Sequence, residues 1–250
     1  MQCALSPHLL PSLDDTSIDY LDMALDACLG VGGAQAKALQ ALGARYPLVF
    51  QSESLSLGGP GLLDQKLLRD FRVFLQTHRA LALTEPLAWT ADDSLLFAAL
   101  PIPSTAEAVA WTAARIVQAQ AAIGCPIGVA NVVHHLIPPG AEMSEPEFVT
   151  QVVELANCQL HLDLTALHLN SQNFGFDALA FLDALPLARV TLVRVSGCID
   201  NAQGHLRRDA HGPIPSVLWD LLDHVYDRVG RQVATSVTIN HVARLKEVAA

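Results

Sequence analysis

The chain of 250 residues is apolar and acidic: 51% of its residues are hydrophobic, 16% are charged, and the formal net charge is −10. This length suits one α/β barrel spanning residues 1–250, and the composition excludes a disordered chain. The 15 lysines and arginines are scattered, which argues against nucleic acid as a partner, whereas a basic peptide would suit the acidic charge.

The first half of the chain alternates apolar runs with segments that favour helices. The runs predicted as strands are residues 3–7, 18–26, 46–52 and 80–89. Between them, the Ala-rich residues 34–44 and the amphipathic residues 62–78 are predicted to form helices. Ser104 and Glu107 have the spacing of a capping box, which predicts a long helix ending near Gly124.

The second half continues the alternation. Ser144 and Glu147 form another capping-box pattern, which opens a helix through Leu155. The remaining predicted strands are residues 126–133, 158–163, 188–197 and 232–239, and the remaining predicted helices are residues 176–185 and 215–230. Eight strands alternating with helices predict a (β/α)8 TIM barrel. A doubly wound open sheet is the alternative, but no dinucleotide-binding fingerprint supports it.

Targeting signals are not apparent. The five cysteines have no CxxC spacing, which is typical of reduced thiols in a cytoplasmic protein. The first residues lack the basic start and apolar core of a signal peptide, and no apolar run reaches the roughly 18 residues of a membrane span. We therefore expect a cytoplasmic protein without a membrane partner.

The stretch CQLHLDLTALHLNSQNFG, residues 158–175, carries the clearest chemical signal. It is interpreted as a buried strand that ends in a polar loop, with His161 and Asp163 on one face. A carboxylate on a buried face is costly unless it meets a cation or several hydrogen-bond donors. Asp209 and His211 form a second pair at the same spacing. Together the two His/Asp pairs predict a functional site at this end of the strand.

The segment LHLDLTALHLNSQNFGFDALAFLDALP resembles the "LLLDVNN, NxGxD, YLDALP" segment of the multinuclear non-haem iron-dependent oxidases, TIM-barrel enzymes that modify peptides. Six further segments resemble motifs of this family in the same order: YPLVFQSESLSLGG, LTEPLAW, AALPIPSTAEAV, GVANVV, VRVSGC and DAHGPIPSVLWDLL. The resemblance covers roughly residues 4 to 240. It implies a barrel whose mouth binds peptide and iron.

The chain departs from the family where the resemblance implies metal-binding or active-site residues. Those positions hold Gln51, Pro86, Ala130, Arg194, Cys198, Thr238 and Asn240. Asp163, Asp209 and His211 remain, and Asp22 and Asp26 stand in the early motif. Most iron ligands in such a site are imidazoles. Because this chain lacks most of them, the resemblance implies a centre with too few ligands for a multinuclear cluster.

Two interpretations of the remaining residues stay open. Asp163, Asp209 and His211 can form a residual site for iron or another divalent metal, with His161 as a replacement ligand. Alternatively, the two carboxylates bond to Arg194 or to backbone amides, and His161 is a buried, hydrogen-bonded histidine. We favour the second interpretation, in which no cofactor is bound.

The expected function is therefore that of a degenerate, non-catalytic homologue, a pseudoenzyme that binds a peptide or a partner protein, including an active homologue. The residues expected to bind substrate are Glu85, Asn131, Arg194 and Asn173. The alternative is a metal-dependent oxidase of ribosomal peptides with a mononuclear site. A purely structural subunit is a third class, which a large apolar outer surface would indicate.

Overall fold

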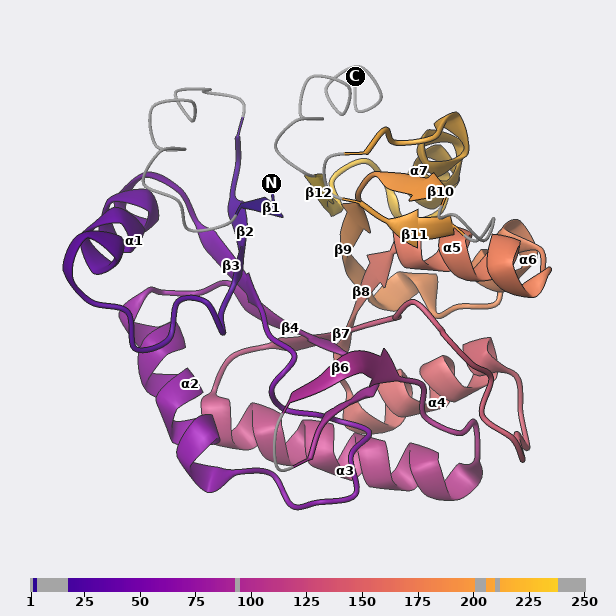
Figure 1. The fold of residues 1–250 in the computed structure, drawn as a ribbon, viewed down its shortest axis with the longest axis horizontal. Helices are drawn as coiled ribbons and strands as arrows, with labels where there is room; N and C mark the ends of the chain where they lie inside the picture. Colours follow the sequence, from indigo (N-terminus) through magenta and orange to yellow (C-terminus); the bar gives the residue numbers. More distant parts are fainter. Residues whose placement is uncertain (1, 4–17, 93–94, 201–205, 210–211, 238–250) are drawn as a thin grey trace.

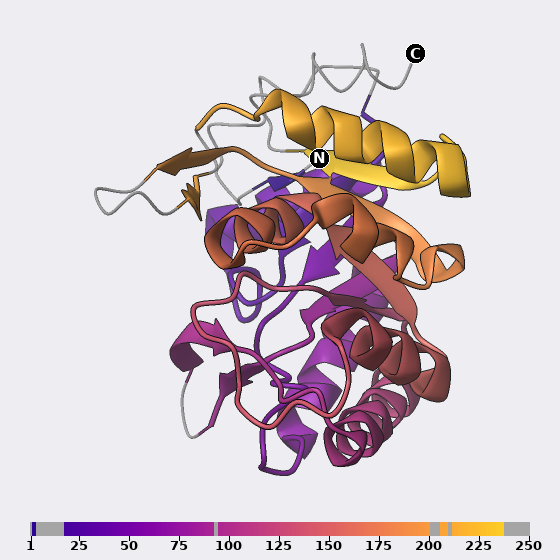
Figure 2. The same cartoon turned by 90° about the vertical axis from the view of Figure 1, so that its right-hand side faces the viewer.

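A computed structural model describes residues 2–3, 18–92, 95–200, 206–209 and 212–237. Eight parallel strands pair in the order β1 (Gln2–Cys3), β2 (Leu21–Ala24), β3 (Leu48–Gln51), β4 (Ala82–Pro86), β7 (Ile127–Ala130), β8 (Gln159–Asp163), β9 (Val190–Val195) and β12 (Ala234–Val237). The two ends of this order, β1 and β12, lie near each other in both views (Figures 1 and 2). The sheet is thus a nearly closed barrel with its strands in sequence order. The prediction of a TIM barrel is confirmed.

The helices follow one another around the outside of the sheet (Figure 1). They are α1 (Gly33–Arg45), α2 (Gln65–Thr77), α3 (Ala106–Ile123), α4 (Glu145–Ala156), α5 (Leu164–Phe174), α6 (Ala178–Asp183) and α7 (Ser216–Val229), with a short 3-10 helix, η2 (Leu187–Arg189). Two antiparallel hairpins, which the sequence did not predict, follow strand ends: β5 (Trp89–Ala91) with β6 (Leu95–Leu100), and β10 (Cys198–Asp200) with β11 (Leu206–Arg208).

Capping side chains set the starts of α3 and α4, the two helices for which the sequence predicted capping boxes. The capping box of Ser144 and Glu147 is confirmed at the start of α4. The predicted box of Ser104 and Glu107 is wrong, because the Thr105 side chain caps α3 by accepting from the Ala108 amide at 3.2 Å. Thr105 is the last extended residue before the helix, so its hydroxyl reaches the free amides.

The polar loop predicted after Asp163 is also wrong, since α5 begins directly at the next residue. Asp163 ends β8 in an extended conformation, and its carboxylate caps the new helix. A strand therefore turns into a helix without a loop. His168, five residues after Asp163, is buried within α5.

Two apolar layers hold the barrel together. A large layer between sheet and helices contains most of the buried leucines, valines and isoleucines. A small layer of Val49, Ala82 and Leu192 lies apart from it. Because side chains alternate along a strand, these three residues lie on the barrel interior, on the same face as Gln51, Thr84 and Arg194. In the part of the chain that the structure describes, no helix is long and apolar enough to cross a membrane.

Candidate functional site

A cavity of about 460 Å³ opens where the strands of the barrel end. Its walls include strand-end residues of β3, β4, β7, β8 and β9, which are Gln51, Pro86, Ala130, Asp163 and Arg194. Binding sites of TIM barrels lie at this face, because the loops after the strands meet there. We call this space the mouth cavity. Four of these five residues replace metal-binding or active-site residues that the family resemblance implies, and the fifth, Asp163, remains from that set.

Arg194 is the main charged group on the cavity floor. Its Nε donates to Asp22 Oδ2 at 2.6 Å and its Nη2 to Asp22 Oδ1 at 2.9 Å, which makes a two-point ion pair. The Arg194 and Asp22 side chains are only 4% and 0% exposed. Burial alone lowers the pKa of Arg194, but the Asp22 carboxylate and the charge of Asp163 outweigh it and raise that pKa. The guanidinium is thus a fixed positive charge.

The polar contacts continue from Arg194 into the barrel. Arg194 Nη2 also donates to Thr84 Oγ1 at 2.8 Å, and Thr84 Oγ1 lies 2.5 Å from His161 Nδ1. Because Thr84 accepts from Arg194, its own hydrogen is free to donate to the imidazole. Burial and the Arg194 charge lower the pKa of His161 to about 3. His161 is therefore neutral, buried and hydrogen-bonded to Thr84.

Gly128 makes room for the His161 ring on the neighbouring strand. A Cβ atom at this position would lie 2.1 Å from the ring carbon Cδ2. Gly128→Ala is therefore expected to lower the free energy of unfolding by about 1–3 kcal/mol, as overpacking does. Denaturant unfolding measures this change in the free energy of unfolding. The effect should shrink in a His161→Ala background, and Gly61→Ala, with open space around it, serves as the control. Equal effects of Gly128→Ala in both backgrounds would contradict this packing.

Asp163 has partners at both carboxylate oxygens. Oδ1 accepts from the Ala166 amide at 2.8 Å, and Oδ2 accepts from Arg208 Nη2 at 2.7 Å. Arg208 comes from β11 and also donates to Ser196 Oγ at 2.6 Å. Through this arginine, the hairpin after β9 is fixed to the end of β8. The carboxylate is used as a helix cap and as the partner of a guanidinium.

Asn131 extends the sheet at the mouth. Its Nδ2 donates to the Asp163 carbonyl at 2.9 Å, and its Oδ1 accepts from the Asp163 amide at 2.8 Å. The side chain thus bonds to β8 as a further strand residue would. Asn131 lines the mouth cavity, at the strand end where it was predicted.

A second carboxylate group lies on the opposite wall of the mouth cavity. Asp26 accepts hydrogen bonds from Ser52 Oγ at 3.0 Å, Ser54 Oγ at 2.7 Å and the Glu53 amide at 3.0 Å. These bonds fix the loop after β3. Within the described residues, neither Asp26 nor Glu53 forms an ion pair, whereas both arginines of the cavity do. The mouth therefore carries excess negative charge.

The other residues expected at the site lie elsewhere. Glu85 is fully buried on the helix-facing side of β4 and does not line the mouth cavity. Asn173 holds the backbone of Leu206, donating to its carbonyl at 3.0 Å and accepting from its amide at 3.1 Å. Cys198 is buried, and burial raises the pKa of its thiol, so it is not an activated nucleophile.

The predicted metal ligands are only partly within the described residues. Asp209 accepts from the Gly212 amide at 3.2 Å, so both Asp163 and Asp209 bond to backbone amides, as one of the two interpretations required. Arg194 pairs with Asp22 and not with these carboxylates. His211 lies outside the described residues, as do Thr238 and Asn240. The residual metal site of Asp163, Asp209, His211 and His161 stays a prediction.

The described donor set does not fit the multinuclear iron centre that the resemblance implies. Across the described ranges, no group of three or more His, Cys, Asp or Glu side chains is arranged to hold a metal ion. Asp163 already has two partners, and a guanidinium lies on the cavity floor beside it. Iron of this kind needs several open carboxylate and imidazole ligands.

Sequence reasoning missed Arg208, Asp26 and Glu53 as wall residues of the mouth. The hairpin that places Arg208 has strands of only three residues, too short for a periodic signal. Asp26 stands in the early family-like motif, which is the one sequence signal that could have identified it. His134 lies beside the mouth, with its Nε2 2.9 Å from Glu145 Oε1.

Solved structures with a similar fold have little sequence similarity to the chain. Endonuclease IV from Thermus thermophilus aligns with a TM-score of 0.60 and 14% identity, covering 100% of this chain and 97% of that one. A D-tagatose 3-epimerase-like protein aligns with a TM-score of 0.59 and 12% identity, covering 99% and 96%. These likenesses support the barrel fold alone.

Sequence relatives are much closer. A UPF0276 protein of Alcanivorax borkumensis is 39% identical over 217 residues, which covers 85% of this chain and 72% of the relative. Another from Nitrosospira multiformis is 36% identical over 227 residues, covering 89% and 80%. The family model described as "RiPP precursor modification enzyme MbnB/TglH/ChrH" matches residues 4–247. The chain therefore belongs to the MbnB/TglH/ChrH family of peptide-modification enzymes, the multinuclear iron oxidase group that its motifs resemble.

Proposed function

We propose that this chain is a non-catalytic member of its family, which binds a peptide or a segment of a partner protein, such as an active homologue, at the barrel mouth. The buried pair of Arg194 and Asp22 carries this proposal. Arg194 stands where the resemblance implies an imidazole, and its guanidinium supplies a fixed positive charge among carboxylates. Such a charge repels a cation placed beside it.

The mouth cavity supports the binding part of the proposal. Its volume of about 460 Å³ lies within the range of typical ligand sites. The family-like scaffold motifs persist in the sequence while the metal-type positions are replaced, and undirected decay would damage both sets. Retention of a shaped, polar mouth in which Gln51, Pro86, Ala130 and Arg194 replace metal-type residues favours a binding role.

Metal content tests the proposal. Protein prepared without chelator from iron-supplemented cells is expected to hold far less than one iron, manganese or zinc ion per chain, because Arg194 and Arg208 neutralise Asp22 and Asp163. Elemental analysis by mass spectrometry, together with the visible absorption of the protein, measures this.

A stoichiometric metal that is lost in Asp209→Ala would overturn the proposal and favour the mononuclear oxidase. Asp200→Ala is the matched control, because Asp200 is an exposed aspartate on the hairpin that directly precedes Asp209. Metal that survives in Asp209→Ala but is lost in Asp163→Ala would likewise contradict the absence of a functional centre.

A further inference from the structure

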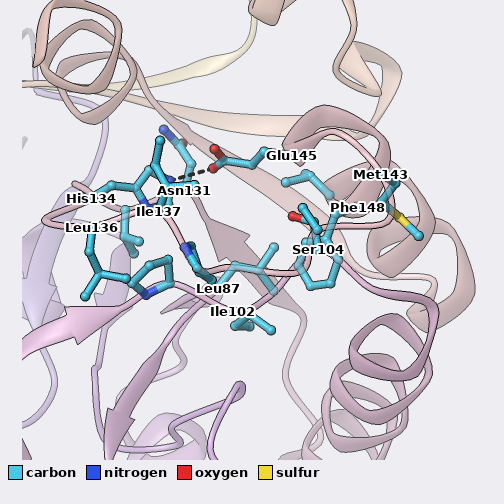
Figure 3. Close-up of a pocket in the computed structure, with 15 residues that line it drawn as sticks. Leu87, Ile102, Ser104, Asn131, His134, Leu136, Ile137, Met143, Glu145 and Phe148 are labelled. Atoms are coloured by element: carbon cyan, nitrogen blue, oxygen red, sulfur yellow. Dashed lines mark hydrogen bonds and ion pairs between the residues drawn. The ribbon is translucent and has the colours of Figure 1, made fainter. Parts of the chain in front are cut away.

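A second, smaller cavity lies beside the mouth cavity, between the loops after β6 and β7 and the start of α4 (Figure 3). We call it the side pocket. Most of its wall is apolar: Leu87, Ile102, Leu136, Ile137, Met143 and Phe148. At the rim, the Leu136 and Ile137 side chains are 47% and 68% exposed. Two adjacent large apolar side chains therefore stay in contact with water unless a ligand covers them.

The size of the side pocket limits what it can hold. Its volume is about 150 Å³, well below the roughly 300–1,000 Å³ of sites that enclose a whole drug-sized ligand. An apolar cavity of about 150 Å³ can hold one benzene molecule. The pocket thus has room for one leucine, methionine or phenylalanine side chain.

One wall of the side pocket is polar, and hydrogen bonds fix it in place, while the buried His134 Nδ1 has no partner among the described residues. His134 Nε2 lies 2.9 Å from Glu145 Oε1, and the dashed line in Figure 3 marks this contact. Asn170 Oδ1 accepts from the His134 amide at 2.8 Å, which fixes the loop after β7 to α5. These contacts hold the pocket open in a defined shape, so little ordering is needed when a side chain enters.

The side pocket is adjacent to the mouth cavity. Asn131 and Val132 line both cavities and form the wall between them. An extended ligand that crosses this shared wall therefore contacts both cavities. In an extended peptide, neighbouring residues are about 3.3 Å apart, so residues that enter adjacent cavities are close neighbours in the peptide sequence.

The charge of the mouth selects what accompanies the apolar side chain. Asp26 and Glu53 are exposed carboxylates of the mouth with no ion-pair partner among the described residues, whereas Arg194 and Arg208 are each paired with an aspartate. A lysine or arginine of the ligand would complement this excess charge. An acidic ligand residue would be repelled by it.

Resting on the proposed function, we infer that the bound segment is an extended peptide with one large apolar residue, seated in the side pocket, and a lysine or arginine within three residues of it, directed at Asp26 and Glu53. The pocket supplies affinity through apolar burial, and the carboxylates supply selectivity for the cation. The mouth and the side pocket then recognise a short peptide motif that contains one basic and one apolar residue.

Fluorescence anisotropy with labelled peptides of about ten residues tests this. Glycine and serine peptides carry one leucine and one lysine at spacings of one to three residues. Matched peptides replace leucine by serine or lysine by glutamate. Leucine burial is worth about tenfold or more in affinity, so the serine peptide should bind at least about tenfold more weakly. The glutamate peptide should bind still more weakly.

Two variants test whether the leucine binds in the side pocket and the lysine binds at the mouth carboxylates. Ala141→Trp, at an exposed wall position of the side pocket, should fill the pocket and remove the preference for leucine. Glu53→Lys should weaken binding of the lysine peptide about tenfold and improve binding of the glutamate peptide. The controls are Ala180→Trp on α6 and Glu154→Lys on α4, both exposed and outside the two cavities.

The outcomes separate this inference from the proposed function. Binding with the expected preferences that both variants abolish supports it. Peptides that bind at the mouth without preference, or whose binding Ala141→Trp leaves unchanged, overturn the inference and leave the proposed function intact. If no peptide binds and metal analysis finds a stoichiometric ion, both fail.

Discussion

Arg194→Leu is expected to lower the free energy of unfolding by about 3–5 kcal/mol, the usual effect of removing one partner from a buried ion pair. The substitution leaves the Asp22 carboxylate fully buried without its guanidinium, and it removes the donor to Thr84. Chemical denaturation monitored by circular dichroism measures the loss. We expect Arg194→Lys to be intermediate, because an ammonium keeps the charge but loses the two-point geometry.

A double variant separates the ion pair from the packing around it. Asp22→Leu combined with Arg194→Leu replaces both charges by apolar groups and should recover much of the stability lost in Arg194→Leu. Lys66→Met is the surface control: its 2.6 Å pair with Asp70 is exposed, and its loss should have a much smaller effect. If Arg194→Leu were no worse than Lys66→Met, the pair would not hold the barrel floor together.

The barrel could be predicted from the sequence, because most of its barrel strands and outer helices carry a local signal. The strands after β1 are short apolar runs, and the helices have amphipathic or Ala-rich patterns with recognisable caps. Errors occurred where competing local signals lie next to each other. Thr105 follows Ser104 directly, and Asp163 ends a strand while it caps a helix.

The candidate site was less predictable, because its contacts join distant parts of the chain. Asp22 and Arg194 are 172 positions apart, and Thr84 and His161 are 77 apart. Only the order of strands in the closed sheet brings these side chains together. The motifs located the strand ends that line the mouth, but they could not tell which of two arginines pairs with Asp163. The structure gives that partner as Arg208, on an unpredicted hairpin.

Asp163 also shows how a metal-type position can be reused without changing the residue. At the end of β8 its carboxylate caps α5 and binds a guanidinium. Both roles need the same negative charge in the same place that metal coordination would need. Retention of this aspartate is therefore compatible with the loss of a cluster, and the neighbouring Arg194 and Arg208 are the more informative residues.

Glu85→Gln is expected to make the protein more stable at neutral and alkaline pH than the wild type. Burial raises the pKa of the Glu85 carboxyl well above its usual value, and this outweighs the opposing effect of nearby Ser52 and the Leu55 backbone. Neither carboxyl oxygen has a hydrogen-bond partner among the described residues, because the Ser52 hydroxyl donates to Asp26. A neutral amide of the same shape suits this position better than an ionised carboxylate.

The raised pKa of Glu85 determines how the stability difference between Glu85→Gln and the wild type changes with pH. Above about pH 4.3, the unfolded chain releases the Glu85 proton, while the folded chain keeps it until the raised pKa is passed. The folded state then binds more protons, so wild-type stability from this group falls as pH rises, by up to about 1.4 kcal/mol per pH unit. Glutamine does not titrate. The advantage of Glu85→Gln should therefore be absent near pH 4 and should grow towards pH 8, as measured by urea unfolding at several pH values.

Comparison between variants isolates Glu85 from the other carboxyl groups. Groups such as Glu147, whose pKa is lowered by the Ser144 side chain and amide, contribute the same slope to both proteins and cancel in the difference. Glu154→Gln, at an exposed position of α4, should run parallel to the wild type. If Glu85→Gln also ran parallel, or lost stability most at high pH, Glu85 would be ionised in the fold and in need of a cation. That cation would have to lie beside β4, next to the loop that Asp26 fixes at the mouth.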